Sequence, residues 1–324
     1  MSGIAVKLEE STDEAFGSPP QKRPVGELLE SGIVALDKPC GPSSHEVTSW
    51  VKRLTGARKA GHAGTLDPNV SGVLPVGING AVKALGFLLC RRKEYAGIIA
   101  FHRRIAESDV RRGFAAFTGD ISQLPPVRSA VRRRERKRKV YYLQLAQYVA
   151  PEALFLVGCE AGTYVRKLCF DMGSFLGCGA NMLELRRTRA GAFGEAECVT
   201  LHELSDAMWL WKERGDEREL RRCVRPVEDA LLEKKVWLRD SAVDAVCNGA
   251  RLGMPGIAKV EDGIEAGETV ALMTQKEELV AFARANAGSE SMVMEAKGIA
   301  AETIRVLMKA GTYPRGWKTS EKPV

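Results

Sequence analysis

The stretch GHAGTLDPNVSG, residues 61–72, contains a histidine, three glycines, a threonine and an Asp-Pro pair, and its only sizeable apolar side chains are Leu66 and Val70. An aspartate before a proline commonly starts a turn or caps a helix, and the stretch taken alone favours that interpretation of Asp67. The alternative is a carboxylate that a rigid glycine-rich loop holds as a nucleophile or a base. The rest of the chain has to discriminate between the two.

Length and composition predict a soluble protein with two domains. The chain has 324 residues, and its hydrophobic fraction of 45% is enough to fill two cores. It contains no apolar run of about eighteen residues, and its beginning lacks the basic and apolar regions of a signal peptide. The eight cysteines form no Cys-x-x-Cys pair, which is typical of free thiols in a reducing compartment. We therefore expect a cytoplasmic protein.

The net charge of +7 is concentrated in one segment. VRSAVRRRERKRK, residues 127–139, contains eight Lys and Arg residues and one Glu, whereas the other 311 residues carry 40 basic and 40 acidic groups. Such a run can be merely a solvated loop. Guanidinium groups pair well with phosphates and repel one another unless an anion is near, so we expect a polyanionic partner, nucleic acid rather than a membrane.

The spacing of apolar residues predicts a mixed fold. A short buried strand is expected at 33–36, followed by a helix over 43–56 that starts with a capping box and ends at a glycine. Strands are expected within 70–80 and 140–162, the latter as a hairpin, and a helix is expected over 166–179. Strands that cluster, rather than alternate regularly with helices, indicate the α+β class.

Composition divides the chain into four parts. Residues 1–26 are polar and partly acidic, so we expect a flexible N-terminal arm. The mixed fold occupies 27–233. Residues 234–311 change to short strands with Gly- and Glu-rich turns, typical of a small β-barrel, and the helix near their start is expected to be capped by Ser241. Residues 312–324 are expected to be a tail.

Two common kinds of site are not expected. The four histidines, His45, His62, His102 and His202, lack spacings such as His-Glu-x-x-His, so we expect each to be structural or a hydrogen-bond partner rather than a metal ligand. The segment GHAGTLDP has glycines but no Gly-Lys-Ser/Thr, which excludes a phosphate-binding P-loop.

Four ordered blocks link the opening stretch to distant parts of the chain. They are ALDKPCGPSSHEV, GHAGTLDPNVSGVLPVGINGAVKAL, RRKEYAG, and CEAGTYVRKL followed by LELRRTRAGAF. Together they resemble the motifs of the TruB family of RNA pseudouridine synthases, and the resemblance extends over residues 27–311. It implies a catalytic domain at 27–233 with a mixed, largely antiparallel sheet and flanking helices. The module at 234–311 resembles a PUA domain, an RNA-binding barrel often attached to such enzymes.

Within the family, one branch matches best. The segments LPPVRSAVRRRERKRKVYYLQL, GANMLELRRTRAGAF and KVWLRDSAVDAVCNGARLGMPGIAKV resemble the archaeal and eukaryotic H/ACA catalytic subunits, the dyskerin group, rather than the bacterial tRNA enzyme. Long Lys-rich tails are missing, so we expect the archaeal type. The resemblance implies that a guide RNA selects the uridine in rRNA or tRNA and that small ribonucleoprotein subunits complete the particle.

The resemblance also implies the chemistry. Pseudouridine forms when the N1–C1′ bond of uridine breaks and C5 joins C1′, which needs no redox cofactor, nucleotide or metal. Asp67 corresponds to the essential carboxylate, acting as a nucleophile on the base or the sugar, or as a base at the ribose. Because the target base must leave its stack, a pocket has to hold it by stacking and polar contacts.

Other roles carry over onto matching positions. Tyr95 would stack on the uracil and help to remove the C5 proton, and Arg166 would keep Asp67 ionised in a site that otherwise desolvates it. The remaining assignments are Leu185 (apolar contact to the ring), Tyr164 (support of the pocket), His62 (contact to RNA near the flipped nucleotide), and Lys38 with Pro39 (bracing of the catalytic loop). Core packing is the alternative for Tyr164 and Leu185. Arg186, Arg187 and Arg189 are expected to face either RNA or solvent.

The basic run corresponds to the family's thumb loop, a mobile element that covers bound substrate. The residues assigned to RNA binding are Arg132, Arg133, Arg134, Arg136, Lys137, Arg138 and Lys139.

Three hypotheses follow from these observations. The chain is a guide-dependent pseudouridine synthase, a guide-independent enzyme acting on the T-arm of tRNA, or a non-catalytic RNA-binding scaffold that uses only its C-terminal module. The joint presence of Asp67, Tyr95 and Arg166 argues against the scaffold, which has no use for all three.

Overall fold

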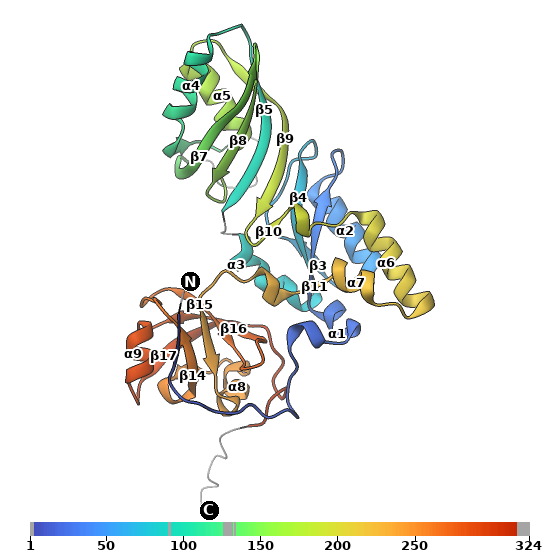
Figure 1. Cartoon of the computed structure of the whole chain (residues 1–324), viewed down its shortest axis with the longest axis vertical. Helices are drawn as coiled ribbons and strands as arrows, with labels where there is room; N and C mark the ends of the chain where they lie inside the picture. The colour runs from blue at the N-terminus through green and yellow to red at the C-terminus, as the bar shows by residue number, and fades with distance from the viewer. Residues whose placement is uncertain (1–2, 90–91, 126–131, 133, 316–324) are drawn as a thin grey trace, which may run out of the picture. The chain divides into compact units, whose positions relative to one another are not determined.

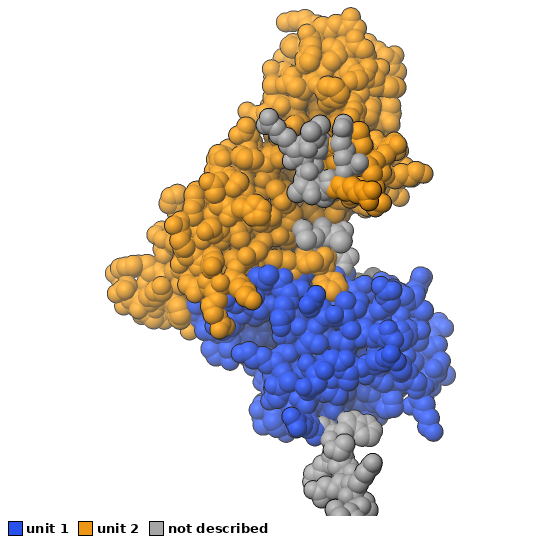
Figure 2. Space-filling view, turned by 180° about the vertical axis from the view of Figure 1, so that it is seen from behind, with its two compact units in different colours: residues 1–33, 79–84, 225–324 blue, residues 34–78, 85–224 orange. Residues whose placement is uncertain are grey.

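The computed structural model describes residues 3–89, 92–125, 132 and 134–315 of the chain. They form two compact units, coloured separately in Figure 2. Unit 1 comprises residues 1–33, 79–84 and 225–324, and unit 2 comprises residues 34–78 and 85–224. Unit 1 thus joins the predicted N-terminal arm to the predicted C-terminal module.

Unit 2 is built on one mixed sheet with helices packed against it (Figure 1). Its strands are β2 (Gly32–Lys38), β3 (Ala60–His62), β4 (Ser71–Ile78), β5 (Lys93–Phe101), β6 (Gly119–Gln123), β7 (Arg136–Val149), β8 (Glu152–Cys159), β9 (Ala180–Ala190) and β10 (Phe193–Gly194). Its helices are α2 (Ser44–Thr55), α3 (Leu85–Leu89), α4 (Glu107–Ala116), α5 (Val165–Phe175), α6 (Leu201–Arg214) and α7 (Arg218–Cys223).

The strand order in unit 2 is β2-β4-β9-β5-β8-β7-β6, with β3 paired to β4 and β10 paired to β9. Strands β4 and β9 run parallel, whereas the pairings from β9 through β5, β8 and β7 to β6 are antiparallel. Helices α4 and α5 lie on one face of the β5, β8 and β7 part of the sheet (Figure 1). The predicted α+β class with a largely antiparallel sheet is confirmed.

The local predictions for unit 2 hold, with one boundary shifted. In α2 the Ser43 hydroxyl accepts a hydrogen bond from the Glu46 amide, and the Glu46 carboxylate accepts one from the Ser43 amide, so the capping box is present. Strands β7 and β8 form the expected hairpin. Helix α5 ends at Phe175, earlier than the predicted residue 179.

Unit 1 contains a seven-stranded sheet of order β1-β14-β12-β15-β16-β17-β13. Its strands are β1 (Ile4–Val6), β12 (Lys235–Leu238), β13 (Leu252–Gly253), β14 (Ile257–Glu261), β15 (Thr269–Met273), β16 (Leu279–Ala285) and β17 (Ile299–Val306), and β11 (Arg225–Pro226) pairs with the start of β2. Its helices are α1 (Val25–Glu30), α8 (Asp240–Cys247) and α9 (Ser289–Met294). Val236, Leu272 and Val280 lie fully buried in its core, and burial of each such side chain contributes about 2 kcal/mol.

The start of α8 corrects one prediction. Ser241 does not cap this helix, because the capping position is Arg239 and Ser241 lies inside the first turn. Within the described residues, no side chain caps the helix. The Asp240 carboxylate instead accepts hydrogen bonds from the Thr12 hydroxyl and the Asp13 amide. The first residue of α8 is therefore bonded by Thr12, which lies more than 200 residues away in the sequence.

The expected flexible arm is wrong for residues 3–26. Strand β1 pairs antiparallel with β14, and Lys7 Nζ donates to the Met292 carbonyl at 2.6 Å. Glu10 accepts a hydrogen bond from Arg239 at 2.9 Å. The polar residues that made this segment resemble a solvated arm have partners on the C-terminal module, which composition does not reveal.

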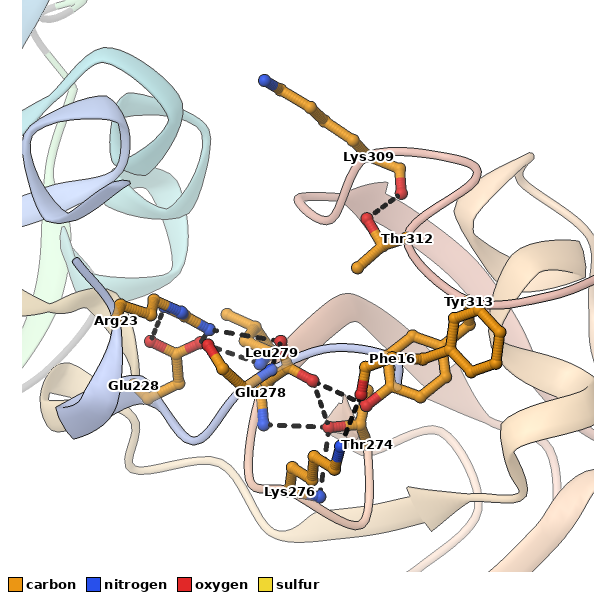
Figure 3. Close-up of polar contacts among 11 residues, drawn as sticks. Phe16, Arg23, Glu228, Thr274, Lys276, Glu278, Leu279, Lys309, Thr312 and Tyr313 are labelled. Atoms are coloured by element: carbon orange, nitrogen blue, oxygen red, sulfur yellow. Dashed lines mark hydrogen bonds and ion pairs between the residues drawn. The ribbon is translucent and has the colours of Figure 1, made fainter. Parts of the chain in front are cut away.

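The buried carboxylate of Glu278 contacts segments near both ends of the described chain, and Figure 3 shows its contacts with Thr274 and Tyr313. Glu278 is 4% exposed. It accepts hydrogen bonds from the Tyr313 hydroxyl at 2.7 Å, the Thr274 hydroxyl at 3.0 Å and the Ser18 amide at 3.2 Å. Tyr313 is 1% exposed, so it belongs to the core of unit 1 rather than to the predicted tail at 312–324.

We expect Tyr313→Phe to destabilise this part of unit 1 by about 2 kcal/mol, because a buried carboxylate loses a charge-assisted donor. Amide hydrogen exchange in β15 and β16 of the full chain measures the effect as faster exchange. Tyr141→Phe, at an exposed position of β7, is the matched control. Equal exchange in the two variants would show that the Tyr313 hydroxyl contributes nothing.

Candidate active site

Residues 63–70 connect β3 to β4 without regular secondary structure, and Asp67 lies at their turn. The Val70 amide donates to the Asp67 carbonyl at 3.0 Å. Ser44, the first residue of α2, fixes Leu66 from both sides, because its hydroxyl accepts from the Leu66 amide and donates to the Leu66 carbonyl, each at 2.8 Å. The backbone on either side of Asp67 is therefore held in place.

Lys38 secures the same loop from within the protein. Its side chain is fully buried at the end of β2. Its ammonium group donates to the carbonyls of Pro39 at 2.8 Å, Pro68 at 3.1 Å and Val70 at 2.9 Å. Burial is the main cause that lowers the pKa of Lys38 below its usual range. Lys38 and Pro39 thus lie where a brace for the loop is needed.

Asp67 itself faces solvent and forms an ion pair with Arg166. Arg166 Nη2 donates to Asp67 Oδ2 at 2.5 Å. The Asp67 side chain is 50% exposed and the Arg166 side chain is 61% exposed. Arg166 lies in the first turn of α5, where the helix dipole disfavours a cation, so the carboxylate compensates an otherwise unfavourable charge. The expected desolvation of Asp67 is not provided by the protein, and the carboxylate is open to a ligand.

Tyr95 on β5 and Leu185 on β9 are diagonal neighbours in the sheet, because Tyr95 is opposite Arg187 and Leu185 is opposite Gly97. Each side chain is 8% exposed. Leu185 is opposite Gly97, where an added Cβ would come within 2.8 Å of Leu185 Cδ1 and 2.6 Å of Phe155 Cζ. Only glycine fits at this position, and its absence of a side chain lets Leu185 pack over the strand.

Arg187 corrects the expectation that it faces RNA or solvent, since it is 1% exposed. Its Nε donates to the Val73 carbonyl at 2.6 Å and its Nη2 donates to the Gly64 carbonyl at 3.1 Å. Its guanidinium also hydrogen-bonds the Tyr95 hydroxyl. Strand alternation could have indicated this burial, because Leu185 and Arg187, two residues apart, share one face of β9.

The neighbouring arginines have different surroundings. Arg186 pairs with Asp37 at 2.9 Å and with Glu195 at 2.5 Å, and these carboxylates raise its pKa above the usual range. Arg189 is half exposed, with Glu94 at 3.9 Å. Both are therefore at or near the surface, unlike Arg187.

His62 and Tyr164 belong to different elements of unit 2. His62 belongs to β3, its ring contacts that of His45 edge-on at 5.0 Å, and burial followed by the charges of His45 and Arg187 lowers its pKa. Its Nδ1 is buried and has no hydrogen-bond partner within the described parts of the chain. Tyr164 precedes α5, and its backbone amide and carbonyl are both bonded by the Gln123 side chain.

The basic run is half strand, which corrects the expectation of a mobile loop over Arg132–Lys139. Residues 136–139 belong to β7 and pair with β6, Arg136 opposite Gln123 and Lys137 opposite Ser122. Arg132 and Arg134 are exposed and lie outside helices and strands. Arg133 lies outside the described residues.

Alternation divides the strand part into two rows of cations. Arg136 and Arg138 are half-buried, whereas Lys137 and Lys139 are exposed. Arg138 Nη1 lies 3.3 Å from the Glu160 carboxylate.

The described residues contain neither a metal-binding cluster nor a membrane-spanning helix. Among them, no group of three or more His, Cys, Asp or Glu side chains could hold a metal ion. Within the same ranges of the chain, no helix is long and apolar enough to span a bilayer.

Comparison with known proteins identifies the family. The N-terminal domain of TruB family pseudouridylate synthases matches residues 52–165, and the C-terminal domain of tRNA pseudouridylate synthase B matches 166–232. The "Probable tRNA pseudouridine synthase B" of Methanosarcina acetivorans is 51% identical over 314 residues, which are 97% of this chain and 93% of the relative. The chain belongs to the TruB family of pseudouridine synthases. A PUA domain matches residues 234–307, and a DKCLD (NUC011) domain matches residues 1–48.

Other TruB relatives and solved structures match over almost the whole length. The relative from Archaeoglobus fulgidus, which carries the same name, is 48% identical over 99% of both chains. A chain in the structure of an H/ACA RNP bound to a substrate RNA containing 2′-deoxyuridine superposes with a TM-score of 0.91 at 43% identity, covering 98% of both chains. A chain in the crystal structure of a Cbf5-Nop10-Gar1 complex gives a TM-score of 0.91 at 45% identity, covering 97% of this chain and 96% of the other.

As a TruB pseudouridine synthase, the chain is an isomerase. The family, the fold class and the activity predicted from the four ordered blocks are confirmed. The roles of individual site residues stay predictions, because none of the comparisons tests them.

We expect Lys38→Met to lower the free energy of local opening of residues 61–72 by about 2 kcal/mol, because three backbone carbonyls lose their donor. Amide hydrogen exchange over residues 61–72 measures the loss of protection. Lys52→Met, at an exposed position of α2, controls for the substitution itself. Unchanged protection in Lys38→Met would mean that the loop is held by its other contacts alone.

Proposed function

We propose that this pseudouridine synthase is the catalytic subunit of an H/ACA ribonucleoprotein, in which a guide RNA selects the target uridine in rRNA or tRNA and small protein subunits complete the particle. The observation that carries the proposal is the similarity, over 98% of the chain, to a protein solved in a substrate-bound H/ACA RNP. The DKCLD and PUA matches extend this similarity beyond the catalytic domain.

Asp67 is the catalytic carboxylate in this proposal. It lies in a loop whose backbone is held by hydrogen bonds, its side chain is half exposed, and Arg166 Nη2 donates a hydrogen bond to it at 2.5 Å. Bound RNA would remove the water around Asp67 and so strengthen its interaction with the reacting ribose and base. The isomerisation exchanges a C–N bond for a C–C bond within one nucleotide and uses neither a metal nor a redox cofactor.

The flipped uracil binds against Tyr95 and Leu185 through the small area that each leaves exposed. Tyr164 supports this pocket from the start of α5, and His62 contacts RNA beside the flipped nucleotide. His62 directly precedes the Asp67 loop in the sequence, and Tyr164 lies two residues before Arg166.

A second candidate is guide-independent modification of the tRNA T-arm. The names of the relatives favour it, since those of Methanosarcina acetivorans and Archaeoglobus fulgidus are both called tRNA pseudouridine synthase B. The two candidates share one active site and differ in how the substrate is selected. We place either reaction in the cytoplasm, where the seven cysteines described as free thiols would stay reduced.

The decisive assay measures pseudouridine in a T-arm RNA and in a guide-matched RNA, with and without guide RNA and the small subunits. Guide-dependent turnover supports the first candidate, and turnover of the T-arm without guide supports the second. Asp67→Asn should abolish product in every condition while RNA affinity stays within about threefold, because the change removes charge but little volume. Asp206→Asn, at an exposed position of α6, should behave like the wild type. Product from Asp67→Asn would refute the assigned role.

The row formed by Arg136 and Arg138 contacts the phosphates of the substrate strand. Residues opposite each other in an antiparallel pair share a face, so Arg136 lies on the side of Gln123, whose side chain bonds the Tyr164 backbone. Arg138 Nη2 lies against Gly162, two residues before Tyr164. Lys137 and Lys139, which the basic run also placed among the RNA-binding residues, lie on the other face of β7, and we do not expect them to contact this RNA strand.

We therefore expect Arg136→Gln with Arg138→Gln to lower the slope of log K against log salt, by about 0.7 for each phosphate of single-stranded RNA that is no longer neutralised. Lys137→Gln with Lys139→Gln removes the same charge from the opposite face and should leave the slope near that of the wild type. Titration of RNA binding at several salt concentrations measures both. Equal reductions of the slope in the two double variants would mean that the run acts only through its total charge.

A further inference from the structure

Arg187 is an unusual residue for the interior of a protein. It is 1% exposed, and within the described chain no carboxylate lies within ion-pairing distance of it. Its three partners are the Val73 carbonyl, the Gly64 carbonyl and the Tyr95 hydroxyl, all of them neutral. A buried cation without a counter-charge is costly, so its hydrogen bonds have to satisfy it.

The guanidinium of Arg187, which belongs to one strand, contacts three other segments of the chain. Arg187 projects from β9, Val73 lies in β4, Gly64 lies in the Asp67 loop, and Tyr95 lies in β5. The planar fork of arginine fixes the directions of these bonds relative to one another, which a lysine at the same place cannot do.

The backbone of Arg187 is fixed as well. Gly72 pairs with Arg187 across β4 and β9, and a Cβ at Gly72 would lie 2.2 Å from the Arg187 carbonyl oxygen. The start of β4, where the Asp67 loop ends, is therefore packed directly on β9, the strand that carries Arg187.

We propose that Arg187 is a positioning residue of this enzyme, which holds the Tyr95 hydroxyl and the Asp67 loop at a set separation by bonding both with one rigid guanidinium. The proposal rests on the roles proposed above for Asp67 and Tyr95. Arg187 itself touches neither substrate nor reacting atoms.

The hydrogen bond also fixes the direction of the Tyr95 hydroxyl. Arginine has donors only, so the Tyr95 oxygen is the acceptor and its own hydrogen points away from the guanidinium. Burial is the main cause that raises the pKa of Tyr95, with opposing effects from Arg187 and further raising by Cys159 and Asp67. Arg187 in turn faces Cys198 and lowers the pKa values of Lys38 and His62.

The test is Arg187→Lys, which retains the charge and loses the fork. Single-turnover pseudouridine formation is measured on an RNA that the wild type converts. We expect the rate constant to fall about 100-fold, as a small misplacement of reacting groups does, with RNA affinity within about threefold. Arg189→Lys, the same change on the same strand at a half-exposed site, should stay near the wild type. A rate for Arg187→Lys within about twofold of the wild type would overturn the proposal.

A double-variant cycle tests the link to Tyr95. Tyr95→Phe keeps the ring and removes the oxygen that Arg187 bonds. If Arg187 acts partly through that oxygen, Arg187→Lys costs less in the Tyr95→Phe background than in the wild type. Fully additive losses would contradict the proposed link. A normal rate in Tyr95→Phe alone would instead refute the role of the Tyr95 hydroxyl and leave the activity of the enzyme and the role of Asp67 intact.

A second measurement does not depend on the folding of Arg187→Lys. In Tyr95→Phe the guanidinium loses one of its three partners, so residues 61–72 should exchange their amide hydrogens faster than in the wild type. Tyr141→Phe, on an exposed part of β7, is the control. Identical exchange of residues 61–72 in wild type and Tyr95→Phe would show that Tyr95 and the loop are not coupled through Arg187.

Discussion

Backbone carbonyls of an irregular connection near a protein core need donors, and two buried cations supply them on either side of Asp67. Lys38 bonds the carbonyls of Pro68 and Val70, and Arg187 bonds that of Gly64. The connection between β3 and β4 is therefore rigid although it has no regular secondary structure. Because the backbone is satisfied from within, the Asp67 side chain can remain at the surface, where it pairs with Arg166 and stays accessible to substrate.

The charges around the loop have a consistent sign. Lys38 and Arg187 are buried beneath it, and Arg166 lies beside it, so the carboxylate of Asp67 is surrounded by cations. Arg187 lowers the pKa values of Lys38 and His62, which is the cost of gathering positive charge in one place. A nucleic acid backbone brings the compensating negative charge. The positive charge around the loop thus favours the binding of an anionic substrate.

Unit 1 depends on contacts between the two ends of the chain. Glu278 accepts a hydrogen bond from the Ser18 amide near the N-terminus. It accepts another from the Tyr313 hydroxyl near the end of the described chain (Figure 3). Composition predicts a flexible arm and a tail for these segments, since their residues are polar or lie beyond the last strand. Both segments nevertheless belong to the packed module. Composition does not reveal this, because Glu278 is more than 200 residues from Ser18 and 35 residues from Tyr313 in the sequence.

Local sequence was sufficient to predict the family, the α+β class and the capped helix α2, because ordered motifs and helix capping need only neighbouring residues. The pairing of Arg166 with Asp67 could be expected from the family, and the structure brings them to 2.5 Å. Only the folded chain shows that Arg187 is buried while Arg186 and Arg189 are not, that the basic run is divided between two faces of β7, and that the N-terminal segment is ordered. Alternation along β9 and β7 indicates which side chains share a face, but which face is buried depends on the strand or module that lies opposite, and long-range packing decides that partner.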